Sequence, residues 1–161
     1  EYIRALSPEA FSEVATQYFQ LSGWQPVNLD LHVLSDLSSL IQERIEKLAD
    51  IVKLVDWLFN EEPAVETDPK EMKKISKSMS ADKVADVLDL AIEQLEKCDW
   101  NEEVIGETIN GIGHSLETKS QVPIRVAVTG RRIGLPLFKP MEILGRQKVV
   151  TRLKKARADL G

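Results

Sequence analysis

Signals for the beginning and end of helices recur along this chain, and they constrain its fold more than any other feature of the sequence. Ser7 followed by Pro8 is typical of an N-cap residue and a proline in the first helical turn, and Gly23 is a typical helix end. Ser80 predicts the start of another helix. The apolar residues after Ser80 recur at helical spacing and share one face: Val84, Val87, Leu88, Ala91 and Leu95. The sequence therefore predicts an all-α protein.

The helical pattern is interrupted near residue 60. Before that point we expect a helix capped by Ser35 that runs to about Leu48, followed by a helical segment over residues 49–59. Residues 60–68 are rich in glutamate and contain a proline, so they break the pattern and are the expected linker. We therefore predict two consecutive small helical subdomains, residues 1–60 and residues 61–161.

The second subdomain has its own helix signals. An Asp-Pro pair at Asp68 predicts a helix start, as does Asn101 with two glutamates behind it. Gly145 separates a short element over 138–144 from a final helix over 146–157. The segment 124–129 has the β-branched content of a strand. A strand without a partner strand cannot form a sheet, and we predict a helix there.

Composition limits the class of protein. Of the 161 residues 43% are hydrophobic and 29% are charged, which is typical of a globular domain. No apolar run approaches the roughly 20 residues that a membrane helix needs. The single cysteine, Cys98, excludes an internal disulfide and suits the reducing cytoplasm, where we expect the protein. The opening residues have no signal-peptide character, and we expect a fragment of a longer chain.

The net charge of −5 is unevenly distributed. Residues 118–161 carry 11 Lys and Arg against two acidic residues, Glu142 and Asp159, whereas the rest of the chain is strongly acidic. A basic end on an acidic body predicts a localised site for a polyanion. The alternative is a basic C-terminal helix that complements its own dipole, which explains Lys154, Lys155 and Arg157. It does not explain Arg125, Arg131 and Arg132.

No set of residues with catalytic or metal-binding spacing is evident. His32 and His114 lie far apart in sequence, and neither is spaced from a cysteine or acidic cluster as metal ligands are. Residues 74–78, Lys-Ile-Ser-Lys-Ser, resemble a phosphate-binding lysine loop, but they have no glycine-rich turn and no strand before them. We interpret that match as chance. We expect no catalytic residue, no metal site and no cofactor in this chain.

Arg44 has an unusual position in the helical pattern. On a helical wheel of residues 37–48 it falls in the middle of the apolar stripe, not on the polar side. Its guanidinium could lay its stem over the core, pair with a buried acid, or project between helices toward a ligand. Periodicity does not separate these alternatives.

The segment after Gly130 contains the residue types that bind single-stranded RNA. Such RNA is read by placing bases on flat or apolar surfaces and hydrogen-bonding their edges. Arg131 and Arg132 supply charge, and Gly134 lets a ligand approach the backbone. The apolar candidates for base contact are Leu135, Leu137 and Phe138. An ordinary helix–helix connection, with Leu137 and Phe138 in the core, explains these last two equally well.

Two stretches of the sequence together resemble one family. The first is Glu1-Tyr2-Ile3-Arg4-Ala5-Leu6-Ser7-Pro8. The second is the run from Arg125 through Gly130 and Pro136-Leu137-Phe138 to Leu144-Gly145-Arg146 and Arg152-Leu153. They are similar to the anticodon-binding region of bacterial-type glutamate–tRNA ligases, which are class I enzymes. The resemblance implies that residues 1–6 are a remnant of a segment that contacts the tRNA stem.

The resemblance also implies roles for particular residues. Arg44 would inspect the first anticodon base, while Arg125 and the loop that follows Gly130 would bind the second and third. The family's frequent Pro-Pro or Thr-Pro before Leu-Phe is replaced here by Gly134-Leu135-Pro136. The implied partner is the anticodon stem-loop of tRNA-Glu, with tRNA-Gln as an alternative, bound by a monomer. ATP and Mg²⁺ would serve a catalytic domain outside this chain.

Another class of function fits part of the sequence. The acidic first 117 residues and their apolar helix faces could serve a helical protein–protein adaptor that binds no RNA. A related ligase with broadened tRNA choice is a third possibility. Salt dependence separates the first two, because RNA binding weakens steeply with ionic strength and hydrophobic docking does not.

Overall fold

The computed structural model describes residues 2–23, 30–59, 74–75 and 77–160, and every regular element within them is helical. A short 3₁₀ helix, η1 (Ile3–Ala5), precedes α1 (Pro8–Ser22), α2 (Leu31–Asp36), α3 (Ser38–Gln42) and α4 (Ala49–Phe59). The rest are α6 (Ala81–Leu95), α7 (Glu102–Leu116), α8 (Gln121–Thr129), α9 (Phe138–Leu144) and α10 (Arg146–Leu160). The predicted all-α class is confirmed.

Three predicted N-caps form as expected. The Ser7 hydroxyl accepts a hydrogen bond from the Ala10 backbone N–H, 3.2 Å away, and Ser80 does the same for Lys83 at 3.2 Å. The Asn101 side chain caps α7 by accepting from the N–H of Val104 at 2.9 Å. These oxygens satisfy backbone donors that have no partner within the helix. The segment 124–129 lies within α8, so its prediction as a helix is also confirmed.

The predicted helix from Ser35 to Leu48 is wrong. Asp30, not Ser35, caps the first helix here, and a joint at Leu37 separates α2 from α3. The chain leaves helical conformation after Gln42. The Asp50 carboxylate accepts the backbone N–H groups of Glu46 and Lys47, both at 3.2 Å, so a side chain stabilises a turn where a helix would otherwise continue. These bonds also lower the pKa of Asp50.

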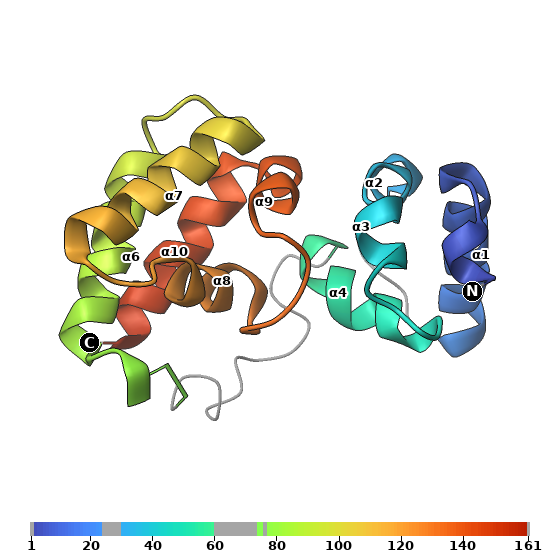
Figure 1. Cartoon of the computed structure of the whole chain (residues 1–161), viewed down its shortest axis with the longest axis horizontal. Helices are drawn as coiled ribbons and strands as arrows, with labels where there is room; N and C mark the ends of the chain where they lie inside the picture. The colour runs from blue at the N-terminus through green and yellow to red at the C-terminus, as the bar shows by residue number, and fades with distance from the viewer. Residues whose placement is uncertain (1, 24–29, 60–73, 76, 161) are drawn as a thin grey trace.

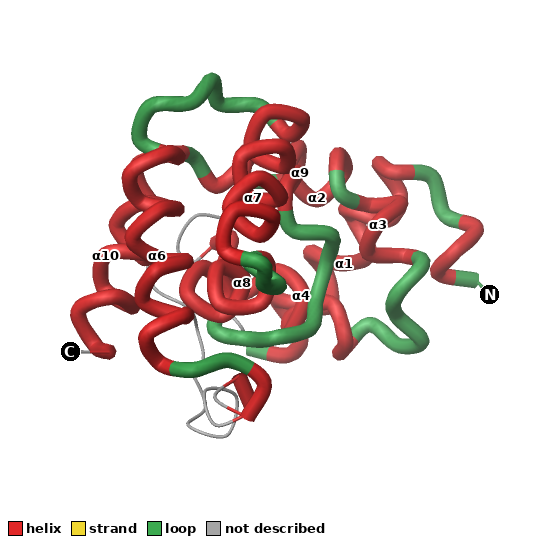
Figure 2. Tube along the Cα trace, turned by 60° about the vertical axis from the view of Figure 1, so that its left-hand side comes forward, coloured by secondary structure: helices red, strands yellow, loops and turns green. Residues whose placement is uncertain are grey.

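The helices form a small group and a larger one (Figure 1). Helices α1–α3 pack together, and α6, α7, α8, α9 and α10 form the larger group around α10 and α6. Helix α4 lies between the groups and reaches α8, as the rotated view also shows (Figure 2). The predicted linker and the boundary at residue 60 fall on residues 60–73, outside the described residues, as does the helix start at Asp68.

Close packing inside the larger group depends on Gly106 of α7. A Cβ at this position would lie 2.9 Å from Cδ2 of the Phe138 ring, closer than side chains tolerate. The half-buried Phe138 therefore sits directly on the backbone of α7, and α9 packs against α7 there.

We expect Gly106→Ala to destabilise the fold by about 1–3 kcal/mol, because the Phe138 ring must move out of its site. Gly111→Ala is the matched control on the same helix. Its added Cβ meets nothing within 4 Å, so it should stabilise the helix by about 0.5–1 kcal/mol. Urea unfolding of both variants measures the difference. Equal stability of the two would contradict the packing described for Phe138.

Candidate nucleic-acid interface

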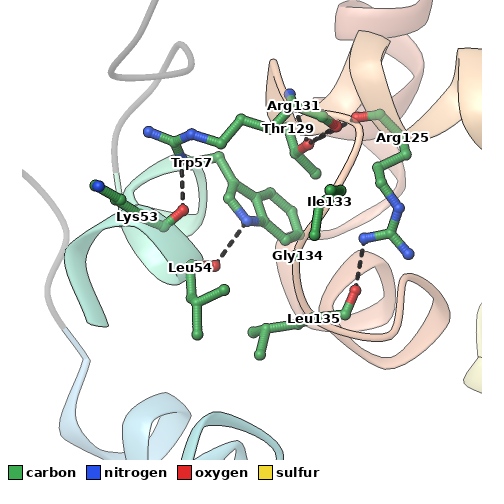
Figure 3. Close-up of a pocket in the computed structure, with 9 residues that line it drawn as sticks. All are labelled: Lys53, Leu54, Trp57, Arg125, Thr129, Arg131, Ile133, Gly134 and Leu135. Atoms are coloured by element: carbon green, nitrogen blue, oxygen red, sulfur yellow. Dashed lines mark hydrogen bonds between the residues drawn. The ribbon is translucent and has the colours of Figure 1, made fainter. Parts of the chain in front are cut away.

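Arg125 lies on α8 and points across the loop that follows that helix (Figure 3). One of its Nη atoms donates a hydrogen bond to the Leu135 carbonyl at 2.6 Å, and the same nitrogen would lie 3.6 Å from a Cβ at Gly134. Burial lowers the pKa of Arg125, and the positive charge of Arg44 lowers it further. An arginine nevertheless remains charged in proteins. The two like charges therefore repel one another.

Arg44 lies outside the larger helix group. It lies in the turn after α3, so its predicted place within an apolar helical stripe is wrong, and the residue is exposed. Its guanidinium donates to the Leu40 carbonyl at 2.9 Å and lies 3.6 Å from the Glu43 carboxylate. An exposed ion pair of this kind contributes little energy. The difference arises because α3 ends at Gln42, before Arg44. Leu37, Ile41 and Ile45 of the same stripe are buried as expected.

Arg131 is held by α4. Its two Nη atoms donate to the two carboxylate oxygens of Asp56, at 2.7 and 2.8 Å, and one of them also donates to the Lys53 carbonyl. The Asp56 side chain is only 3% exposed. The Arg131 guanidinium thus neutralises a buried acid, a role that the sequence did not reveal.

A small recess lies between α4 and the loop between α8 and α9 (Figure 3). Its lining combines cations, an indole and backbone: Lys53, Leu54, Trp57, Arg125, Thr129, Arg131, Ile133, Gly134 and Leu135. Four of the predicted site residues are therefore brought together here, namely Arg125, Arg131, Gly134 and Leu135. Arg132 belongs to the same loop and is half-buried, but it does not line the recess.

The apolar part of the predicted site is arranged differently from our expectation. Leu135 and Leu137 are each only 2% exposed, and Phe138 packs on Gly106, so core packing accounts for the last two. A large exposed apolar side chain of the loop is Ile133, at 80% exposure. Base contacts by Leu137 and Phe138 stay predictions. Their placement favours the core alternative.

Sequence reasoning missed the contribution of α4. Lys53 and Trp57 line the recess, and the indole N–H of Trp57 donates to the Leu54 carbonyl at 3.0 Å. Helical periodicity places Trp57 only on the buried side of its helix. It gives no sign that this side meets a loop some 75 residues later in the chain, whose Arg131 pairs with Asp56. The one available signal was the acid Asp56 among apolar residues of α4.

Comparison with known proteins identifies the class. The sequence model of the family described as "Anticodon binding domain" matches residues 9–157, nearly the whole chain. The chain therefore belongs to the anticodon-binding-domain family. Within the described residues, no helix has the length and apolar character needed to cross a membrane.

Two similar proteins of known identity are glutamate–tRNA ligases. Glutamate–tRNA ligase from Frankia casuarinae is 38% identical over 99% of this chain and 34% of that protein. The enzyme of the same name from Salinispora arenicola is 38% identical over 99% of this chain and 35% of its own length. These matches confirm the resemblance found in the sequence. The chain spans about a third of the length of these relatives.

Solved structures show the same fold. A glutamate tRNA ligase from Elizabethkingia meningosepticum, in complex with its amino acid, superposes with a TM-score of 0.80 over 99% of this chain and 31% of that one. The glutamate–tRNA synthetase of Elizabethkingia anophelis gives a TM-score of 0.72 over 98% of this chain and 30% of that one. At 20% and 19% sequence identity these likenesses establish the helical fold alone.

Proposed function

We propose that this chain is the anticodon-recognising part of a glutamate–tRNA ligase and that it binds the anticodon stem-loop of tRNA-Glu. The observation that carries the proposal is the recess itself, where half-buried Arg125 and the backbone of Gly134 share a lining with Lys53 of α4. Positive side chains beside a glycine backbone make a site for an anionic ligand with hydrogen-bonding edges. Unpaired nucleotides have both properties.

The recess supplies more than charge. Exposed Ile133 offers an apolar surface for a base, and Gly134 leaves the loop backbone open to close approach. Lys53, on the opposite side, is placed to contact a phosphate. One well-oriented contact between an arginine and a base gives about 1–3 kcal/mol of discrimination. Two such contacts would be enough to select one anticodon strongly over others.

The parent enzyme would join glutamate to this tRNA. ATP and Mg²⁺ would be used by a catalytic region outside this chain, and the chain itself would act as a cytoplasmic monomer. Strict selection of tRNA-Glu and relaxed selection that includes tRNA-Gln are both compatible with a pair of reading arginines. The family assignment favours tRNA binding over a protein–protein adaptor.

Titration of the chain with a labelled tRNA-Glu anticodon stem-loop over a series of salt concentrations tests the proposal. We expect binding to weaken steeply, with a slope of about −2 in log K against log salt concentration if three phosphates of the loop are contacted. A loop of scrambled sequence should bind more weakly at every salt concentration. Equal binding of the two loops would contradict anticodon recognition, and salt-independent binding would favour the adaptor.

A further inference from the structure

We propose that Asp56 and Arg131 form a clamp that fixes the position of Arg44 relative to Arg125. Asp56 and Arg131 thereby control anticodon selectivity without touching the RNA. The inference rests on the proposed function. It assigns a positioning role to two residues, of which Arg131 was expected from the sequence to contact RNA directly.

Hydrogen bonds hold Arg131, in the loop after α8, to Asp56 of α4. The two parallel hydrogen bonds from Arg131 to Asp56, at 2.7 and 2.8 Å, fix both distance and orientation, as paired guanidinium and carboxylate groups do. A third hydrogen bond, to the Lys53 carbonyl, ties the same guanidinium to the backbone of α4. Asp56 also accepts the backbone N–H of Trp57 at 2.8 Å, which restrains its carboxylate.

On the side of α8 the clamp connects directly to Arg125. The Thr129 hydroxyl lies 2.8 Å from the Arg125 carbonyl and 3.0 Å from the Arg131 carbonyl, and it accepts the Arg131 backbone N–H at 3.1 Å. Gly130 makes this tight turn with a φ of 80°. The backbone of Arg131 therefore cannot move far without moving the C-terminal turn of α8, which carries Arg125.

On the other side, α4 connects to Arg44. The segment between α3 and α4 covers residues 43–48. Asp50, in the first turn of α4, accepts the backbone N–H groups of residues 46 and 47 and so fixes this segment. Arg44 lies within the segment, and its guanidinium donates to the Leu40 carbonyl. A continuous set of hydrogen bonds and short backbone segments thus joins Arg44 through α4, Asp56, Arg131 and Thr129 to Arg125.

The clamp also opposes a repulsion. Arg44 and Arg125 carry the same charge, and the charge of Arg44 contributes to the lowered pKa of Arg125, so the two repel one another. Without the attraction between Asp56 and Arg131, this repulsion would favour separation of the two groups. Hydrogen-bond geometry at bases fails with small displacements, whereas attraction to phosphates persists. Loss of the clamp should consequently reduce selectivity more than total affinity.

Two variants remove the clamp with little change of shape, and one variant controls for it. Asp56→Asn and Arg131→Lys each abolish the paired hydrogen bonds, since lysine lacks the planar fork of arginine. Asp89→Asn is the control, because it makes the same chemical change and breaks the ion pair with Arg157, 2.9 Å long, within the larger helix group. Circular dichroism shows whether each variant is folded.

Spin labels measure the position of the helix groups without RNA. They are attached through Glu13→Cys on α1 and Glu107→Cys on α7, both exposed positions, after Cys98→Ser removes the native thiol. We expect the distance distribution between the labels to broaden in Asp56→Asn and in Arg131→Lys, but not in Asp89→Asn. An unchanged distribution in both clamp variants would overturn the proposal.

Binding of stem-loops then tests selectivity. We expect the preference for the tRNA-Glu loop over loops with single anticodon changes to fall about tenfold in both clamp variants, a loss comparable to one base contact. Affinity for the scrambled loop should stay within about twofold of the unsubstituted chain. Full selectivity despite broadened label distances would overturn the proposal. If the unsubstituted chain itself bound all loops equally, the proposed function would fail, and the label distances would still show whether the pair holds the two groups together.

Discussion

Arg125→Ala is expected to weaken binding of the tRNA-Glu anticodon stem-loop by about 1–3 kcal/mol while changing affinity for a scrambled loop much less. The Arg125 guanidinium is partly buried beside the recess, and within the described residues it donates one hydrogen bond, to the Leu135 carbonyl at 2.6 Å. An arginine has five N–H donors, so others remain for the edge of a base. Truncation removes those donors together with the charge.

Arg125→Lys separates these two contributions. A lysine keeps the positive charge, and therefore the attraction to phosphates, but lacks the planar arrangement of donors that recognises a base edge. We expect this variant to bind the scrambled loop as well as the unsubstituted chain does and to lose most of the preference for the tRNA-Glu loop. Fluorescence anisotropy with both loops measures the two affinities. Equal weakening on both loops in Arg125→Ala would reduce Arg125 to a phosphate contact.

Leu137→Ala is expected to lower the free energy of unfolding by about 2–5 kcal/mol, the usual cost of removing a fully buried leucine side chain. Leu137 is 2% exposed and belongs to the core of the protein. Because the side chain does not reach the surface, the folded fraction of this variant should keep its preference for the tRNA-Glu loop. The variant therefore separates the core alternative from a base-contact role for Leu137.

Ile133→Ala is the matched control, four residues earlier in the same loop. At 80% exposure its side chain contributes little to the core, so unfolding should change by less than about 0.5 kcal/mol. Loop binding should instead weaken, because the apolar surface offered to a base is lost. Urea unfolding and stem-loop binding are measured on both variants. A stable Leu137→Ala variant with reduced RNA affinity would show that Leu137 contacts RNA despite its burial.

Local signals predicted most of the fold. The caps at Ser7, Ser80 and Asn101 depend on hydrogen bonds to backbone groups three residues away, and such short-range chemistry is visible in sequence. The helix from residue 35 to 48 was predicted wrongly because Asp30 starts a helix before Ser35, and because Asp50 holds a turn after α3 through its own side-chain bonds. Apolar periodicity indicated which side chains are buried, but not whether one helix or several short segments bury them.

Only part of the candidate site could be predicted from the sequence. The basic segment from Arg125 to Gly134 could be found because charge, glycine and apolar residues lie close together in the chain. The pairing of Arg131 with Asp56 joins residues 75 positions apart and depends on how two helix groups meet. No periodicity or motif reports such a contact. For the same reason Lys53 and Trp57 became evident only from the fold.

The most direct test of anticodon recognition at this junction is an NMR titration that follows the arginine side-chain Nε–H signals as the tRNA-Glu stem-loop is added. We predict that the signals of Arg44 and Arg125 shift together with the backbone amide of Gly134, while amides on the outer face of α7 stay in place. Shifts confined to the basic C-terminal part of α10, with Arg44 and Arg125 unchanged, would contradict anticodon recognition at this site.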